Sequence, residues 1–183
     1  MATDQSYVRE IKSYGWEDLN ELWELIISGK IGSHGWGEGR AFEYFIIRAF
    51  ELSGAEVVYP FETKYHDIVL EQSDGIIYAQ NQVYLVECKD QSKNINFDAI
   101  AKLKVRLQRR PQVMLGSIFS TKGFTEPAIM LANVAFPSNI ILWKLDDITY
   151  ALKGRNFTDG MYQKFKELVK HGIGDYDINV GTI

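Results

Sequence analysis

The chain has 183 residues, which is the size of one globular domain or of one domain with an appendage. Hydrophobic residues make up 46% of the sequence and charged residues 24%, which excludes disordered, collagen-like and low-complexity chains, and the single cysteine, Cys88, excludes an internal disulfide and a cysteine-based zinc site. The formal net charge of −4, taken alone, argues against a nucleic-acid-binding protein, because such proteins ordinarily carry a basic surface.

Helical periodicity predicts two helices in the first third of the chain. Apolar residues recur at helical spacing over residues 16–27, and again from Arg40 until Ser53-Gly54 ends the second helix. Five glycines within residues 29–39 predict a flexible hinge between these helices. Three strands are then expected at residues 55–60, 75–79 and 82–89, the last two joined by the polar turn Gln80-Asn81.

The second half of the chain alternates helices and strands. Residues 97–110 form a predicted helix that Pro111 stops, and Thr125 opens another helix as its N-cap, with an early proline at Pro127. The remaining predictions are strands at 113–120 and 139–143, helices at 146–152 and 158–171, and a loose tail. A meander of strands flanked by helices and followed by β-α-β predicts an α/β fold, in which helices cover both faces of a mixed central sheet.

Two carboxylates and a lysine are expected at one end of the predicted hairpin. The two-residue period of a strand places Glu87 and Lys89 on the same face. If the turn holds two residues, Asp74 lies opposite Glu87, with Cβ atoms roughly 4.5–5.5 Å apart. Carboxylates this close repel unless a cation lies between them, and a divalent cation with oxygen ligands would relieve the repulsion. A longer turn would shift the register, and a surface ion pair of Glu87 with Lys89 is the simpler alternative.

Several short motifs resemble those of a known nuclease superfamily. Asp74–Ile77 followed by Val86–Lys89 resembles the metal site of the PD-(D/E)xK nucleases. Gly39–Glu43 resembles the start of the first core helix in the Mrr-type restriction endonuclease branch, with its acidic residue. Ser120–Thr125, followed by Asn139–Leu142, resembles that branch's loop after the fourth strand. The resemblance rests on the order and spacing of these motifs together.

This resemblance implies a restriction-endonuclease-like core with a mixed central sheet and the order αβββαβ over residues 37–152. A helical extension and hinge over residues 1–36 would precede the core, and a C-terminal helix and tail over residues 153–183 would follow it. The implied activity is that of a metal-dependent DNA endonuclease, an Mrr-like restriction and defence enzyme that hydrolyses phosphodiester bonds. Mg²⁺ is the implied cofactor, with Mn²⁺ able to substitute.

The same resemblance implies roles for four residues. Asp74 and Glu87 would bind the metal, and Lys89 would position or help deprotonate the attacking water or stabilise the developing negative charge. Glu43 would be a supporting acid, although it could equally be an exposed helix residue or a partner of Arg40 or Arg48. Two other functions stay open: a repair nuclease resembling Holliday-junction resolvases or RecB-type domains, and a catalytically silent nucleic-acid-binding protein.

The distribution of charge changes what the net charge implies. Residues 89–110 carry a net charge of +5, so the rest of the chain carries −9. Lys102, Arg106 and Arg109 form one stripe on the predicted helix, suited to following DNA phosphates. A solvated helix face is the alternative.

Four further residues are candidate DNA contacts. Lys104 and Gln108 fall among the apolar positions of the same helix and are expected to face inward, although Lys104 could also extend to solvent. Thr121 and Lys122 lie in the loop after a strand, where substrate contacts are common, but a simple turn is an equal alternative.

Neither a signal peptide nor a membrane-spanning segment is expected. Residues 1–10 are polar, and no stretch approaches the roughly 18 uninterrupted apolar residues that cross a bilayer. We therefore expect a soluble cytoplasmic protein that acts on DNA. Because cutting both strands of a duplex calls for two active sites, a homodimer is also expected.

Overall fold

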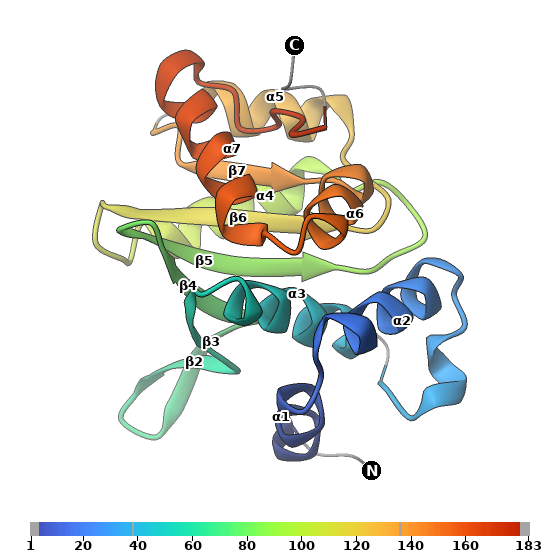
Figure 1. Ribbon diagram of the computed structural model, residues 1–183. Helices are drawn as coiled ribbons and strands as arrows, with labels where there is room; N and C mark the ends of the chain where they lie inside the picture. The colour runs from blue at the N-terminus through green and yellow to red at the C-terminus, as the bar shows by residue number, and fades with distance from the viewer. Residues whose placement is uncertain (1–3, 38, 136, 180–183) are drawn as a thin grey trace.

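The computed structural model describes residues 4–37, 39–135 and 137–179 (Figure 1). It confirms the predicted mixed α/β fold with a helical N-terminal extension. In chain order the elements are α1 (Asp4–Lys12), α2 (Trp16–Ile27), the 3₁₀ helix η1 (Ile31–His34), α3 (Arg40–Leu52), β1 (Glu56–Val58), β2 (Phe61–Tyr65), β3 (Ile68–Ser73), β4 (Gly75–Ala79), β5 (Gln82–Lys89), α4 (Phe97–Leu107), β6 (Met114–Ser120), α5 (Glu126–Val134), β7 (Ile140–Trp143), α6 (Leu145–Lys153) and α7 (Phe157–His171).

The central sheet has five strands in the order β1-β4-β5-β6-β7. β1, β4 and β5 are antiparallel neighbours, whereas β6 and β7 run parallel to β5. Gln80 and Asn81 make the turn between β4 and β5, with positive φ angles of 52° and 61°. Such a turn matches the twist of an antiparallel pair and fixes its register, on which the placement of Asp74 against β5 depends.

Helices cover both faces of the sheet. One face packs against α2, α3, α6 and α7 through an aromatic core that includes Phe45, Phe50 and Trp143. The other face packs against α4 and α5. Gly116 allows α4 to approach this second face closely, because a Cβ at that position would lie 2.7 Å from Cδ2 of Leu103. This close packing fixes the position of α4, which carries Arg106 and is followed directly by Arg109 and Arg110.

Four elements of the structure are additions to the sequence-based predictions: α1, η1, β2 and β3. α1 has only two buried side chains, too few for a clear helical period. The hairpin of β2 and β3 forms a separate two-stranded sheet that projects from the main one (Figure 1). A β-bulge between Thr63 and Lys64 and the exposed run Ile68-Val69-Leu70 remove the alternation of polar and apolar residues that predicts a strand.

The end of the chain differs from the predicted loose tail. Through residues 172–179 the backbone is held against α5 and β7. The backbone N–H of Leu142 donates a hydrogen bond to the carbonyl of Gly174, and the N–H of Gly174 donates one to Oδ1 of Asn133 (both 2.8 Å). The prediction was wrong for these residues because their partners are far away in sequence. In the ranges described above, no helix is long and apolar enough to cross a membrane.

Candidate active site

The β4–β5 hairpin brings the two predicted metal ligands together. Gly75 pairs with Val86, which confirms the register expected from a two-residue turn. Asp74 directly precedes β4, and its Oδ2 accepts a hydrogen bond from the backbone N–H of Cys88 in β5 (2.5 Å). Asp74 therefore lies beside the end of β5 that carries Glu87.

Both carboxylate oxygens of Glu87 are paired with cations. Nζ of Lys89 lies 2.5 Å from Oε1, and Nη1 of Arg106 lies 2.5 Å from Oε2. The side chain of Glu87 is only 13% exposed. Burial lowers the pKa of Lys89, but the nearby Glu87 carboxylate outweighs this effect, so that the pKa is raised overall. Lys89 is therefore a positive charge held against Glu87.

Glu43 completes a group of three acidic residues. It lies in the first turn of α3, where its Oε2 accepts a hydrogen bond from Nη1 of Arg40 (2.8 Å). Burial raises the pKa of Glu43, and Glu87 adds to the rise, although Arg40 acts in the opposite direction. Arg40 also lies 3.6 Å from Oδ1 of Asp4, so α1 reaches the site. Both expected roles of Glu43 are thus compatible with its position: it pairs with Arg40 and lies near the other acids.

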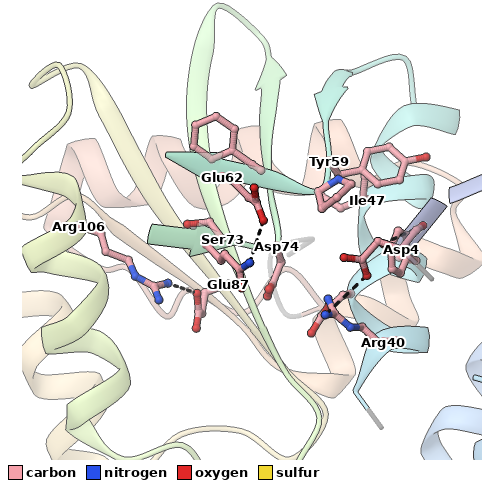
Figure 2. Close-up of a pocket in the computed structure, with 14 residues that line it drawn as sticks. Asp4, Arg40, Ile47, Tyr59, Glu62, Ser73, Asp74, Glu87 and Arg106 are labelled. Atoms are coloured by element: carbon pink, nitrogen blue, oxygen red, sulfur yellow. Dashed lines mark hydrogen bonds and ion pairs between the residues drawn. The ribbon is translucent and has the colours of Figure 1, made fainter. Parts of the chain in front are cut away.

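The three acids line one pocket of about 470 Å³. Figure 2 shows Asp74 between the pair of Glu87 with Arg106 on one side and the pair of Asp4 with Arg40 on the other. The base of the β2–β3 hairpin forms another wall of this pocket. A ligand in this pocket would therefore contact the three acids together with Arg40 and Arg106.

The pKa of Asp74 shows how concentrated the negative charge is. Burial, with the neighbouring charges of Glu43 and Glu87, raises this pKa to about 7, although the hydrogen bond from Cys88 and the charge of Lys89 oppose the rise. Within the described parts of the chain no three His, Cys, Asp or Glu side chains lie close enough to hold a metal ion by themselves. Asp74 and Glu87 nevertheless fit a hard divalent cation, because carboxylate oxygens are its preferred ligands and a cation would relieve their repulsion.

An arginine cluster around Glu71 adjoins the site and was missed in the sequence. The Glu71 side chain in β3 is 5% exposed. Nη2 of Arg109 lies 2.5 Å from its Oε2, while Nη2 of Arg110 and Nε of Arg106 lie 3.2 and 3.8 Å from its Oε1. The predicted stripe is only partly helical, because α4 ends at Leu107 and not at Arg110: Arg106 lies in its last turn and Arg109 in the turn that follows, and both contact carboxylates. The only sequence signal for Glu71 was an acidic residue three positions before Asp74.

The remaining candidate DNA contacts lie in different places. Lys102 is exposed and lines a second hollow of about 420 Å³, which Glu87, Lys89 and Arg106 also line. The structure does not bring Lys104 to the carboxylates: its Nζ donates hydrogen bonds to the carbonyls of Ala135 and Pro137, beyond the end of α5.

Gln108 lines a pocket with Lys104 that contains none of the three acids. Thr121 is buried, and its hydroxyl donates a hydrogen bond to Oδ1 of Asp90 (2.9 Å), next to Lys89. Lys122 is exposed in the same turn. Among these residues Lys102 lines a hollow together with Glu87, one of the candidate ligands, and Thr121 holds the segment that follows Lys89.

Comparisons with known proteins identify the family and the fold. The family model of the Mrr-type restriction endonuclease domain matches residues 37–152. A search of curated proteins gives no match. Among solved structures, the small subunit of a heterodimeric restriction endonuclease has a TM-score of 0.55 and 13% identity, covering 86% of this chain and 91% of that one.

Two other structures have lower TM-scores. A protein of unknown function has a TM-score of 0.49 and 15% identity, over 72% of this chain and 77% of that one. The MspJI restriction endonuclease in complex with a 27-mer oligonucleotide has a TM-score of 0.42 and 16% identity, over 87% of this chain and 35% of that one. At these identities the likeness to solved structures concerns the fold, and the family match covers most of the chain. The chain belongs to the Mrr-type restriction endonuclease family of PD-(D/E)xK nucleases.

Proposed function

We propose that the protein hydrolyses phosphodiester bonds of DNA with the help of Mg²⁺ held by Asp74 and Glu87. The observation that carries this proposal is the convergence of Asp74, Glu87 and Lys89 at one end of the β4–β5 hairpin, where the two carboxylates lie on the wall of an open pocket. Mn²⁺ would substitute, because it accepts the same oxygen ligands.

The bound cation would supply Lewis acidity toward a phosphoryl oxygen and lower the pKa of a water molecule. The chain's own residues would do the rest. Lys89, held against Glu87, places a positive charge where the attacking water and the developing charge of the phosphate would lie. Glu43 would support the site as a further acid, and Arg40 would keep the Glu43 carboxylate oriented.

We also propose that duplex cleavage uses two copies of this chain. One chain supplies one set of Asp74, Glu87 and Lys89, and a duplex has two strands. The small subunit with the similar fold is itself part of a heterodimeric enzyme. A homodimer would supply the second site here, and the chain would meet its substrate in the cytoplasm.

A cleavage assay tests the proposed reaction. Supercoiled, linear, branched and methylated DNA would be incubated with the protein in Mg²⁺, Mn²⁺ or EDTA, together with Lys89→Ala and Lys93→Ala proteins. Lys93 is an exposed lysine shortly after β5, so it controls for the loss of a positive charge. We expect cleavage by the wild type and the Lys93→Ala protein in Mg²⁺ alone or Mn²⁺ alone. Cleavage in EDTA, or by Lys89→Ala at the wild-type rate, would refute the proposed mechanism, and binding without cleavage would indicate a silent DNA-binding protein.

A further inference from the structure

Both carboxylate oxygens of Glu87, a proposed cation ligand, have a charged partner in this structure. Lys89 takes Oε1 and Arg106 takes Oε2, each at 2.5 Å. Lys89 comes from the same strand, whereas Arg106 comes from α4, on another element. A cation that binds Glu87 through Oε2 must therefore compete with Arg106.

The surroundings of Arg106 allow it to leave Glu87. Its Nε lies 3.8 Å from Glu71, which Arg109 and Arg110 also contact at 2.5 and 3.2 Å. Three guanidinium groups and the Lys89 ammonium thus face the two carboxylates of Glu71 and Glu87, an excess of two positive charges. If Arg106 moved away, Glu71 would keep two arginine partners, so no buried carboxylate would lose its last partner.

Arg106 also lies where a nucleic-acid backbone would meet it. Glu87 and Arg106 line both the pocket of about 470 Å³, where Figure 2 shows their ion pair, and the hollow of about 420 Å³, so the two spaces share this ion pair. Lys102, one turn earlier on α4, lines the second hollow. A chain of phosphates crossing from one hollow to the other would pass the Arg106 guanidinium, which binds phosphate as well as carboxylate oxygens.

We propose that Arg106 is an exchangeable counter-ion, which pairs with Glu87 in the free protein and moves to a DNA phosphate when the duplex binds. Glu87 then becomes available to the divalent cation. This inference rests on the proposed function, since it assumes that Glu87 is a cation ligand. Its consequence is reciprocal: DNA raises the affinity for the cation, and the cation raises the affinity for DNA by the same factor.

Calorimetric titration of the whole protein with Ca²⁺ tests the exchange. Ca²⁺ prefers the same oxygen ligands as Mg²⁺, and a gel run afterwards confirms that the added duplex is intact. For the wild type we expect a rise in Ca²⁺ affinity of about tenfold when a short duplex is added, within the usual range of coupling between sites. For Arg106→Gln we expect about tenfold tighter Ca²⁺ binding without DNA, and little further rise with DNA.

Arg109→Gln is the matched control. This substitution removes the same charge just beyond the end of α4 and takes one partner from Glu71, but Arg109 has no ion pair with Glu87. The Arg109→Gln protein should therefore have the Ca²⁺ affinity of the wild type and the same rise in affinity when the duplex is added. Arg106→Met, which keeps the aliphatic stem of the side chain, provides a second variant should the Gln protein fold poorly.

The outcomes separate the two proposals. Equal Ca²⁺ affinities for the Arg106→Gln, Arg106→Met and Arg109→Gln proteins, or an undiminished rise with DNA in both Arg106 variants, would overturn the exchange alone. The metal site would stand in that case, provided that Asp74→Asn abolishes Ca²⁺ binding. Absence of Ca²⁺ binding in the wild type, with and without DNA, would overturn the exchange together with the proposed metal site.

Discussion

Replacing Asp74 by Asn is expected to stabilise the protein in the absence of divalent cations. Burial and the charges of Glu43 and Glu87 raise the pKa of Asp74 from 3.8 to about 7, so the ionised carboxylate is unfavourable in the folded state. The amide of Asn carries no charge, yet its oxygen can still accept the hydrogen bond from the N–H of Cys88. The substitution should therefore remove the repulsion and keep the contact.

The magnitude follows from the pKa of Asp74. A rise of about three pKa units, at about 1.4 kcal/mol each, means that ionised Asp74 destabilises the folded protein by about 4 kcal/mol when the pH is above the folded-state pKa. The folded state binds the proton of Asp74 more tightly than the unfolded state does. The stability that comes from protonated Asp74 is therefore complete below the unfolded-state pKa and is lost as the pH rises through 7. Asp74→Asn should thus gain up to about 4 kcal/mol over the wild type at about pH 8, and nearly nothing at about pH 4.

Urea denaturation in EDTA across this pH range measures the difference. Asp67→Asn, at the exposed turn of the β2–β3 hairpin, is the matched control and should leave stability unchanged. Mg²⁺ should then raise the unfolding free energy of the wild type and leave that of Asp74→Asn unchanged, because only a ligand of the folded state stabilises it. An Asp74→Asn protein that is less stable than the wild type at about pH 8, or a difference independent of pH, would refute this reasoning.

Three further substitutions test the structure around the site, each by urea denaturation. Glu71→Gln should destabilise the protein by about 3–5 kcal/mol, because it leaves a group of arginines without their buried carboxylate; an unchanged unfolding free energy would contradict the cluster. Gly116→Ala should cost about 1–3 kcal/mol because its Cβ would meet Leu103 at 2.7 Å, and a neutral result would mean that α4 can move away. Asp147→Ala should cost about 3–5 kcal/mol, because the fully buried Lys164 ammonium lies 2.9 Å from Asp147 Oδ2; a cost below about 1 kcal/mol would argue against a charged pair.

The part of the site that lies within one hairpin could be predicted from the sequence. A two-residue turn and the two-residue strand period together place Asp74 near Glu87 and put Lys89 on the Glu87 face. Both rules act over a few residues, and no distant segment changes them. The helical periodicity is an equally local rule and places Lys102 and Arg106 one turn apart on α4, but it does not reach Arg109, because the helix ends at Leu107.

What the sequence could not provide is the set of contacts between distant segments. Glu71 lies 38 residues before Arg109, and no local pattern indicates that the two meet. For the same reason the partner of Lys104 could not be predicted, because the carbonyls of Ala135 and Pro137 belong to a loop some 30 positions later. The β2–β3 hairpin was hidden by its bulge and its exposed apolar residues, which leave no amphipathic period.

The cleavage rate of supercoiled DNA by the wild type and by the Asp74→Asn protein, in Mg²⁺ and in EDTA, shows whether this chain is a nuclease that depends on a metal ion held by Asp74. Both proteins would first be shown to be folded by the denaturation curves described above. The account predicts cleavage by the wild type in Mg²⁺, none in EDTA, and none by Asp74→Asn in either condition. Cleavage by Asp74→Asn at the wild-type rate, or cleavage of DNA by the wild type in EDTA, would contradict it.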